Sequence, residues 1–138
     1  MDELDVYLND VEELDDLWNE YDYTPATWAS RVHTFRALVL KIVKETVEDT
    51  TRIVLMFDPE SIEIKEGDAE APTYLEPLLK YNSKKGSLCG WSYAQKAFKE
   101  MGAGSQQAIE GHYITFVAQE VKYGQEFTRV TMLPVSIE

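Results

Sequence analysis

Cationic and aromatic side chains are concentrated between residues 80 and 99. This stretch contains five lysines and no acidic residue, and aromatic residues are interleaved with the lysines. A single-strand nucleic-acid site needs cations along the backbone path and aromatic faces on which bases stack. We therefore predict that eight residues of this stretch contact nucleic acid: Lys80, Tyr81, Lys84, Lys85, Trp91, Tyr93, Lys96 and Lys99.

Residues outside this stretch are expected to extend the same site. Arg36, Arg52 and Arg129 would add positive charge from the strands. Phe57 and Tyr123 would add stacking surfaces if they lie on the same open face. The alternative interpretation is structural, with Trp91 and Tyr93 packed in the core and the lysines forming a solvated face.

No residue pattern predicts an enzyme. His33, Cys89 and His112 are the only histidines and cysteine, and no local signature joins them into a nucleophilic pair. A zinc site needs about four ligands, and these three residues are widely separated. The glycines form neither a dinucleotide-binding nor a P-loop motif. We therefore expect no catalytic residue, no metal and no cofactor.

The acidic charge is concentrated at the N-terminus. The chain of 138 residues carries 25 acidic and 13 basic residues, a net charge of −12. Residues 1–22 hold ten of the acids and no base, so residues 23–138 are nearly neutral. Electrostatic fields act locally, and the net charge of the chain therefore says little about what residues 23–138 bind.

The same N-terminal residues carry an apolar stripe with helical spacing, which predicts an amphipathic helix over residues 1–22. The stripe consists of Leu4, Tyr7, Val11, Leu14, Trp18 and Tyr21. An isolated helix of this length is marginal in water, so it should form only when the stripe is covered. Three covers remain open: the body of the same chain, a basic partner protein or a second copy.

The cellular compartment is predicted from three features that the sequence lacks: a cysteine pair, a secretion signal and a membrane-spanning segment. A single cysteine allows no internal disulfide, and the first residues contain neither a basic nor an apolar stretch typical of a secretion signal. The longest apolar runs are far shorter than the roughly 20 residues of a membrane-spanning helix. We expect a cytoplasmic protein that is not bound to a membrane.

The hydrophobic pattern divides the rest of the chain into a connector, residues 23–31, and one domain, residues 32–138. A long, bent first strand is predicted over 32–47 and a second over 52–57, with a short third strand near 62–65. Residues 61–81 are otherwise the least regular stretch. A helix is predicted over 87–101, with Gly102 ending it. Alternation predicts strands over 112–121 and 127–135.

This order of elements predicts a mainly β fold with helices. It matches an OB-like, five-stranded Greek-key barrel with a helix between strands three and four. The alternative is another open β-sheet with one or two helices.

Three stretches resemble small phage and prokaryotic OB-fold proteins of the single-stranded-DNA-binding type. They are residues 80–88 (KYNSKKGSL), 98–102 (FKEMG) and 109–113 (IEGHY). The resemblance covers about residues 32–138 and implies an OB fold that binds single-stranded DNA. Two features depart from the bacterial single-strand-binding proteins. The acidic segment here is N-terminal rather than C-terminal, and the chain ends in a predicted strand without a tail.

Two functions follow as hypotheses. The first is a non-enzymatic protein that binds single-stranded nucleic acid without sequence specificity, as an accessory to replication or recombination in a phage-like setting. The second is a protein-interaction module whose acidic helix binds a basic partner, as a nucleic-acid mimic does, or mediates self-association. Under the first hypothesis, the acidic segment could also occupy the basic groove and compete with nucleic acid.

Overall fold

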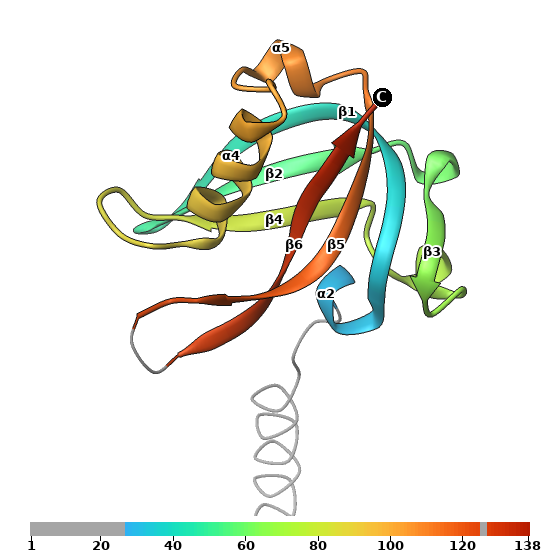
Figure 1. The fold of residues 1–138 in the computed structure, drawn as a ribbon, viewed down its shortest axis with the longest axis horizontal. Helices are drawn as coiled ribbons and strands as arrows, with labels where there is room; N and C mark the ends of the chain where they lie inside the picture. The colour runs from blue at the N-terminus through green and yellow to red at the C-terminus, as the bar shows by residue number, and fades with distance from the viewer. Residues whose placement is uncertain (1–26, 125–126) are drawn as a thin grey trace, which may run out of the picture.

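The computed structural model describes residues 27–124 and 127–138, which form a six-stranded antiparallel sheet with a few short helices (Figure 1). The predicted acidic helix and its six stripe residues lie outside the described residues. In chain order the elements are α2 (Trp28–Arg31), β1 (Val32–Val47), β2 (Thr50–Phe57), a 3-10 turn η1 (Pro59–Ser61), β3 (Glu63–Gly67), α3 (Ala71–Tyr74), β4 (Leu78–Ser83), α4 (Gly90–Glu100), α5 (Gln106–Ile109), β5 (Tyr113–Lys122) and β6 (Thr128–Ile137).

Strand β1 is shared by two parts of the sheet. Its residues 39–47 pair with β2, and its earlier residues lie between β3 and β5. The register shifts between Val39 and Lys41, and Leu40 at the shift is exposed. An extra residue in one strand bends it, so β1 turns here from one ladder to the other. The predicted long, bent first strand is confirmed.

The segment before β5 supplies partners for the backbone of β1 at this bend. The N–H of Gly111 donates to the carbonyl of Val39 at 2.7 Å. The carboxylate of Glu110 accepts from the N–H of Ile42 at 3.1 Å and from Nε2 of Gln106 at 2.6 Å. The hydrogen bond from Gln106, and then the one from Ile42, lowers the pKa of Glu110.

The predicted five-stranded barrel is wrong on three points: the number of strands, the place of the helix and the closure of the sheet. There are six strands rather than five, because β4 forms within the stretch that we expected to be irregular; the short third strand near 62–65 is β3. The predicted helix therefore follows the fourth strand, not the third. The sheet order is β4-β2-β1-β5-β6, with β3 on β1, and no ladder joins β4 to β6 in the described residues.

A side chain connects the two unpaired strands instead. Tyr81 of β4 is buried, and its hydroxyl donates to the carbonyl of Met132 in β6. A tyrosine side chain reaches farther than the spacing of about 4.8 Å between hydrogen-bonded strands. The contact thus holds β4 and β6 near each other without closing the sheet. Burial raises the pKa of Tyr81 well above its usual value, so the hydroxyl stays protonated and able to donate.

Aromatic rings fill the core between the two parts of the sheet. Phe35 lies at the centre, with its ring centroid 4.8 Å from that of Trp28, 5.5 Å from that of Phe57 and 5.2 Å from that of Phe116. All four rings are buried. The connector is anchored by the same cluster, since Nε1 of Trp28 also donates to the carbonyl of Glu76 at 3.1 Å.

Helix α4 is slightly shorter than predicted, and its capping explains the bounds. Ser92 accepts from the N–H of Cys89, which fixes the start. Gly102 ends the helix with φ +82°, as predicted, and the N–H of Ala103 reaches back to the carbonyl of Phe98 at 2.8 Å. Phe98 and Ala94 are buried, as the predicted stripe requires.

The Tyr81 contact can be tested by removing one oxygen atom. Tyr81→Phe leaves the buried carbonyl of Met132 without its donor, so the free energy of unfolding should fall by about 1–3 kcal/mol. Urea denaturation measures the change. Tyr113→Phe is the matched control, because the Tyr113 hydroxyl has no hydrogen-bond partner among the described residues. An unchanged stability in Tyr81→Phe would contradict this role.

The Glu110 contact predicts a pH-dependent stability. The pKa of Glu110 is lower in the folded protein than its usual 4.5, so its charge stabilises the fold above that pH. The contribution disappears as the pH falls through the folded pKa. Glu110→Gln should therefore lower the melting temperature at pH 7, and the difference from the wild type should shrink as the pH falls below 4.5 and through the lowered pKa. A difference that is independent of pH would contradict the account.

Candidate nucleic-acid interface

A groove of about 1010 Å³ runs along the unpaired edges of β4 and β6. Residues 78–82 of β4 and 129–132 of β6 line it. Residues 27–29 and residues 88–90 also contribute to its lining. We call this the β4–β6 groove. It exists because the sheet is not closed at this point.

Four of the predicted cations line the groove: Arg52, Lys80, Lys84 and Arg129. Arg52 lies opposite Asn82 in the β2–β4 ladder, and Asn82 is also a lining residue. Glu76 is the only acidic residue among the described residues that line the groove. The groove is therefore a region of positive charge in a chain with strongly negative net charge.

The groove cations are largely free of carboxylate partners. Among the described residues, only Lys80 of the four lies within 4 Å of a carboxylate, and its Nζ is 3.9 Å from Oε2 of Glu45. Ion pairs at such exposed positions contribute little free energy. A bound anion could therefore replace this partner at small cost.

Apolar and aromatic side chains accompany the charges. Several large apolar side chains of the described residues are exposed to solvent. Four of them line this groove: Tyr74, Leu88, Phe127 and Val130. The guanidinium carbon of Arg129 lies 4.9 Å from the centroid of the Phe127 ring. Cation–π pairing of this kind orients both groups. One site thus offers a positive charge near the start of β6 and an exposed ring two residues earlier, directly before that strand.

Tyrosines at two points of the groove are held by hydrogen bonds. The hydroxyl of Tyr74 donates to Asp68, which lowers the pKa of that carboxyl and raises the pKa of the tyrosine. Tyr123 shares a 2.8 Å hydrogen bond with Thr131. Tyr123 was a conditional candidate from the sequence and lines the groove, whereas Phe57 is in the core.

Three predicted aromatic contacts have structural roles. Tyr81 lines the groove, but it is only 3% exposed and offers no ring face for stacking. Trp91 is half-buried between Tyr81 and Phe98, with centroids 6.0 Å and 6.4 Å away. Tyr93 donates its hydroxyl to the carbonyl of Lys122 and packs edge-on against Tyr123. These contacts favour the core interpretation of Trp91 and Tyr93.

Four predicted cations lie outside the groove lining. Lys96 and Lys99 are exposed on α4, and Lys85 is exposed in the turn before it. Arg36 lies on the other part of the sheet, 4.0 Å above the Tyr113 ring, and pairs with Glu63 and Glu138. The hydrogen bond that Arg36 donates to the carboxylate of Glu138 raises the pKa of Arg36. The structure therefore divides the predicted cations into a groove set and a dispersed set.

The exposed aromatic and apolar residues of the groove were not predicted from the sequence. Arg129 lies in β6 and Phe127 directly before its first residue, and in extended backbone this spacing of two places both side chains on one face. This spacing of an aromatic and a cationic residue could have identified both as candidates from the sequence. Tyr74 and Leu88 come from non-strand segments, and no local pattern brings them to β4.

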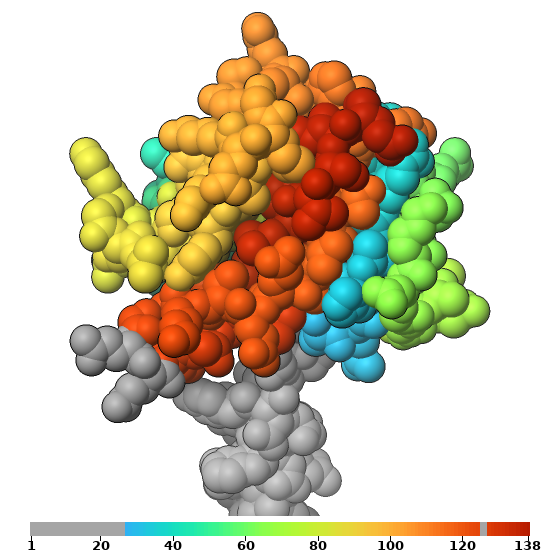
Figure 2. Space-filling view, viewed as in Figure 1, coloured from blue at the N-terminus to red at the C-terminus, as the bar shows by residue number. Residues whose placement is uncertain are grey.

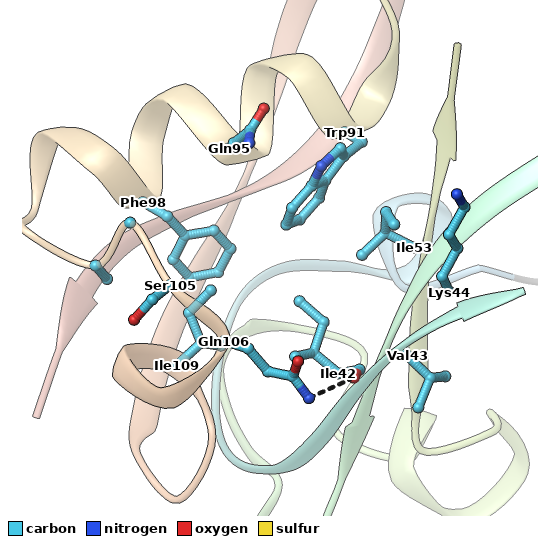
Figure 3. A pocket seen from close by; sticks show the side chains of 12 residues that line it. Ile42, Val43, Lys44, Ile53, Trp91, Gln95, Phe98, Ser105, Gln106 and Ile109 are labelled. Atoms are coloured by element: carbon cyan, nitrogen blue, oxygen red, sulfur yellow. Dashed lines mark hydrogen bonds between the residues drawn. The ribbon is translucent and has the colours of Figure 1, made fainter. Parts of the chain in front are cut away.

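A second, smaller cavity of about 280 Å³ lies between α4, α5 and the β1–β2 hairpin (Figure 3). Its lining is mainly apolar and includes Ile42, Trp91, Phe98 and Ile109. Figure 3 shows the side chain of Gln106 at its edge, bonded to the carbonyl of Ile42 at 3.3 Å. The lining lacks the combination of clustered cations and exposed rings found in the β4–β6 groove.

Other chemistry has little support in the described residues. Cys89 is buried at the start of α4; burial raises the pKa of its thiol, but hydrogen bonds with Lys84 and Ser92 outweigh this effect and lower it. In residues 27–124 and 127–138, no three His, Cys, Asp or Glu side chains cluster to bind a metal ion. None of the helices described is long and apolar enough to cross a membrane.

Comparisons with family models, curated proteins and solved structures find no match for this chain.

Proposed function

We propose that this chain is a non-enzymatic, OB-type protein that binds single-stranded nucleic acid in the β4–β6 groove. The observation that carries the proposal is the convergence of Arg52, Lys80, Lys84 and Arg129 with exposed aromatic rings in one groove. These residues are far apart in sequence and come from three strands and a loop. Figure 2 shows the loop of residues 84–89 next to the β5–β6 hairpin, two segments that both contribute to the groove.

The strand connections support the OB assignment. An OB fold is a partly open five-stranded Greek-key barrel that binds oligonucleotides over strands two and three and the loops between strands one and two and strands four and five. If β3 is left out, strands β1, β2, β4, β5 and β6 take the places of OB strands one to five along the chain. The strands of the OB fold that bind oligonucleotides, the second and third, then correspond to β2 and β4. Helix α4 then precedes the fourth strand, β5. The groove lies along β4 and includes the β5–β6 hairpin.

The chemistry of the groove fits a single strand better than a duplex. Cations contact phosphates of any sequence, and bases stack on exposed rings such as those of Phe127 and Tyr74. In a duplex the base faces are stacked on one another. Because every base has a face that can stack, we expect affinity with little sequence preference.

Charge reversal in the groove tests the proposal. The full-length double variant Lys80→Glu/Arg129→Glu should bind a fluorescein-labelled oligothymidylate at least about tenfold more weakly than the wild type at low salt. The slope of log affinity against log salt should become shallower by about 1.4, since two phosphate contacts are lost. Fluorescence anisotropy titrations at several salt concentrations measure both quantities.

The matched control for this experiment is Lys96→Glu/Lys99→Glu, which makes the same change in net charge on exposed α4 positions outside the groove. Its binding should remain within about twofold of the wild type at moderate salt, where the field of distant charges is screened. Equal loss in both double variants would reject the groove as the site. Absence of binding by the wild-type chain would reject the function.

Removing the exposed ring tests the stacking part of the proposal. Phe127→Ala should weaken oligonucleotide binding by about 5–150-fold, the range for one lost base–aromatic stack, with little change in salt dependence. Val135→Ala removes an exposed apolar side chain of β6 that lies outside the groove and is the control. Anisotropy at fixed salt compares them. A loss of the same size in the control, or no loss in Phe127→Ala, would contradict a stacking role.

A further inference from the structure

The described chain begins in the groove itself. Thr27, Trp28 and Ala29 are lining residues, and the buried Trp28 ring fixes this point of the chain. Only four residues, 23–26, separate Thr27 from the acidic segment of residues 1–22. That segment is therefore tethered at the groove, and its reach is set by its own length rather than by a long linker.

The tethered segment and the groove have complementary compositions. Residues 1–22 carry ten acids and no base, whereas the groove lining contains four cations and a single acid. The segment also carries six apolar stripe residues, among them Leu14 and Trp18. The groove offers exposed apolar partners, among them Leu88, Phe127 and Val130. Both the charge and the apolar surface of the segment thus have counterparts in the groove.

We propose that residues 1–22 dock in the β4–β6 groove of the same chain and thereby oppose the binding of nucleic acid there. The docking rests on the complementarity of segment and groove alone, and the competition also rests on the proposed function. A short tether gives an effective concentration in the millimolar range. If the free segment had a dissociation constant of about 0.1 mM, docking would weaken nucleic-acid binding about tenfold.

A photo-crosslinking experiment on the full-length chain tests docking without nucleic acid. A benzoylphenylalanine at position 18 replaces one aromatic stripe residue by another. Irradiation at low protein concentration should give crosslinks within one chain, and mass spectrometry should map them to the peptides that contain Leu88 and residues 127–132. Lys80→Glu/Arg129→Glu should reduce the yield several-fold, while the α4 control Lys96→Glu/Lys99→Glu should not.

Stripe residues provide a test that leaves the charge of the segment unchanged. In the full-length chain, Leu14→Ser/Trp18→Ser should strengthen oligothymidylate binding about tenfold at low salt, because it removes the apolar part of docking and keeps all ten acids. Long-range repulsion alone would leave the affinity unchanged. This comparison distinguishes a groove that is occupied by the segment from one that nucleic acid avoids only because the acids of the segment repel it.

The outcomes distinguish failure of the inference from failure of the proposed function. Crosslinks that are absent, formed only between chains or spread outside the groove would overturn docking, even if the chain binds oligothymidylate. Groove crosslinks that decrease on addition of oligothymidylate support both docking and competition. The chain could also form groove crosslinks, fail to bind oligothymidylate and show no effect of oligothymidylate on the crosslinks. That result would support docking, but it would overturn both the competition and the proposed function.

Discussion

The bend in β1 is the constraint on which the rest of the structure depends. This strand belongs to both parts of the sheet, and the register shift at Leu40 turns it from the β3 and β5 side to the β2 side. The two parts enclose the aromatic cluster centred on Phe35. Glu110 and Gly111 satisfy backbone groups beside the shift, so the bend does not leave these groups without partners.

The open edge of the sheet follows from the same geometry. The two parts that diverge from β1 end in β4 and β6, and the Tyr81 hydroxyl joins these strands in place of a ladder. An unpaired strand edge usually exposes a protein to association with other chains. Here, cationic side chains such as Lys80 and Arg129 line that edge. The absence of a ladder between β4 and β6 in the described residues thus leaves the β4–β6 groove open.

Local sequence patterns predicted the elements whose signals are local. The β-branched residues of 32–47 and the alternation of residues 112–121 predicted β1 and β5, and the helical spacing of Ala94 and Phe98 predicted the buried face of α4. Strand β4 was missed although its buried Leu79 and Tyr81 alternate with the exposed Lys80 and Asn82, because the strand is short and follows directly on Pro77 in an irregular stretch. The open edge depends on how distant strands meet, and no local pattern encodes that.

The candidate site was predictable only in part for a related reason. Lys80 and Lys99 belong to one basic stretch of sequence, but a strand holds the first in the groove and α4 carries the second away from its lining. Phe127 also lines the groove, although it lies 47 residues after Lys80 in the sequence. The charge pattern of the sequence indicated a basic surface, and the tertiary arrangement determines which of these residues share one groove.

Hydrogen–deuterium exchange of the full-length chain, with and without a single-stranded oligonucleotide, tests the central claim most directly. The account predicts slower exchange in residues 78–83 and 127–132, where the strand edges line the groove, and no change in the exposed face of α4 or in β3. Protection centred on α4, or no protection at saturating oligonucleotide, would contradict a nucleic-acid site in the β4–β6 groove.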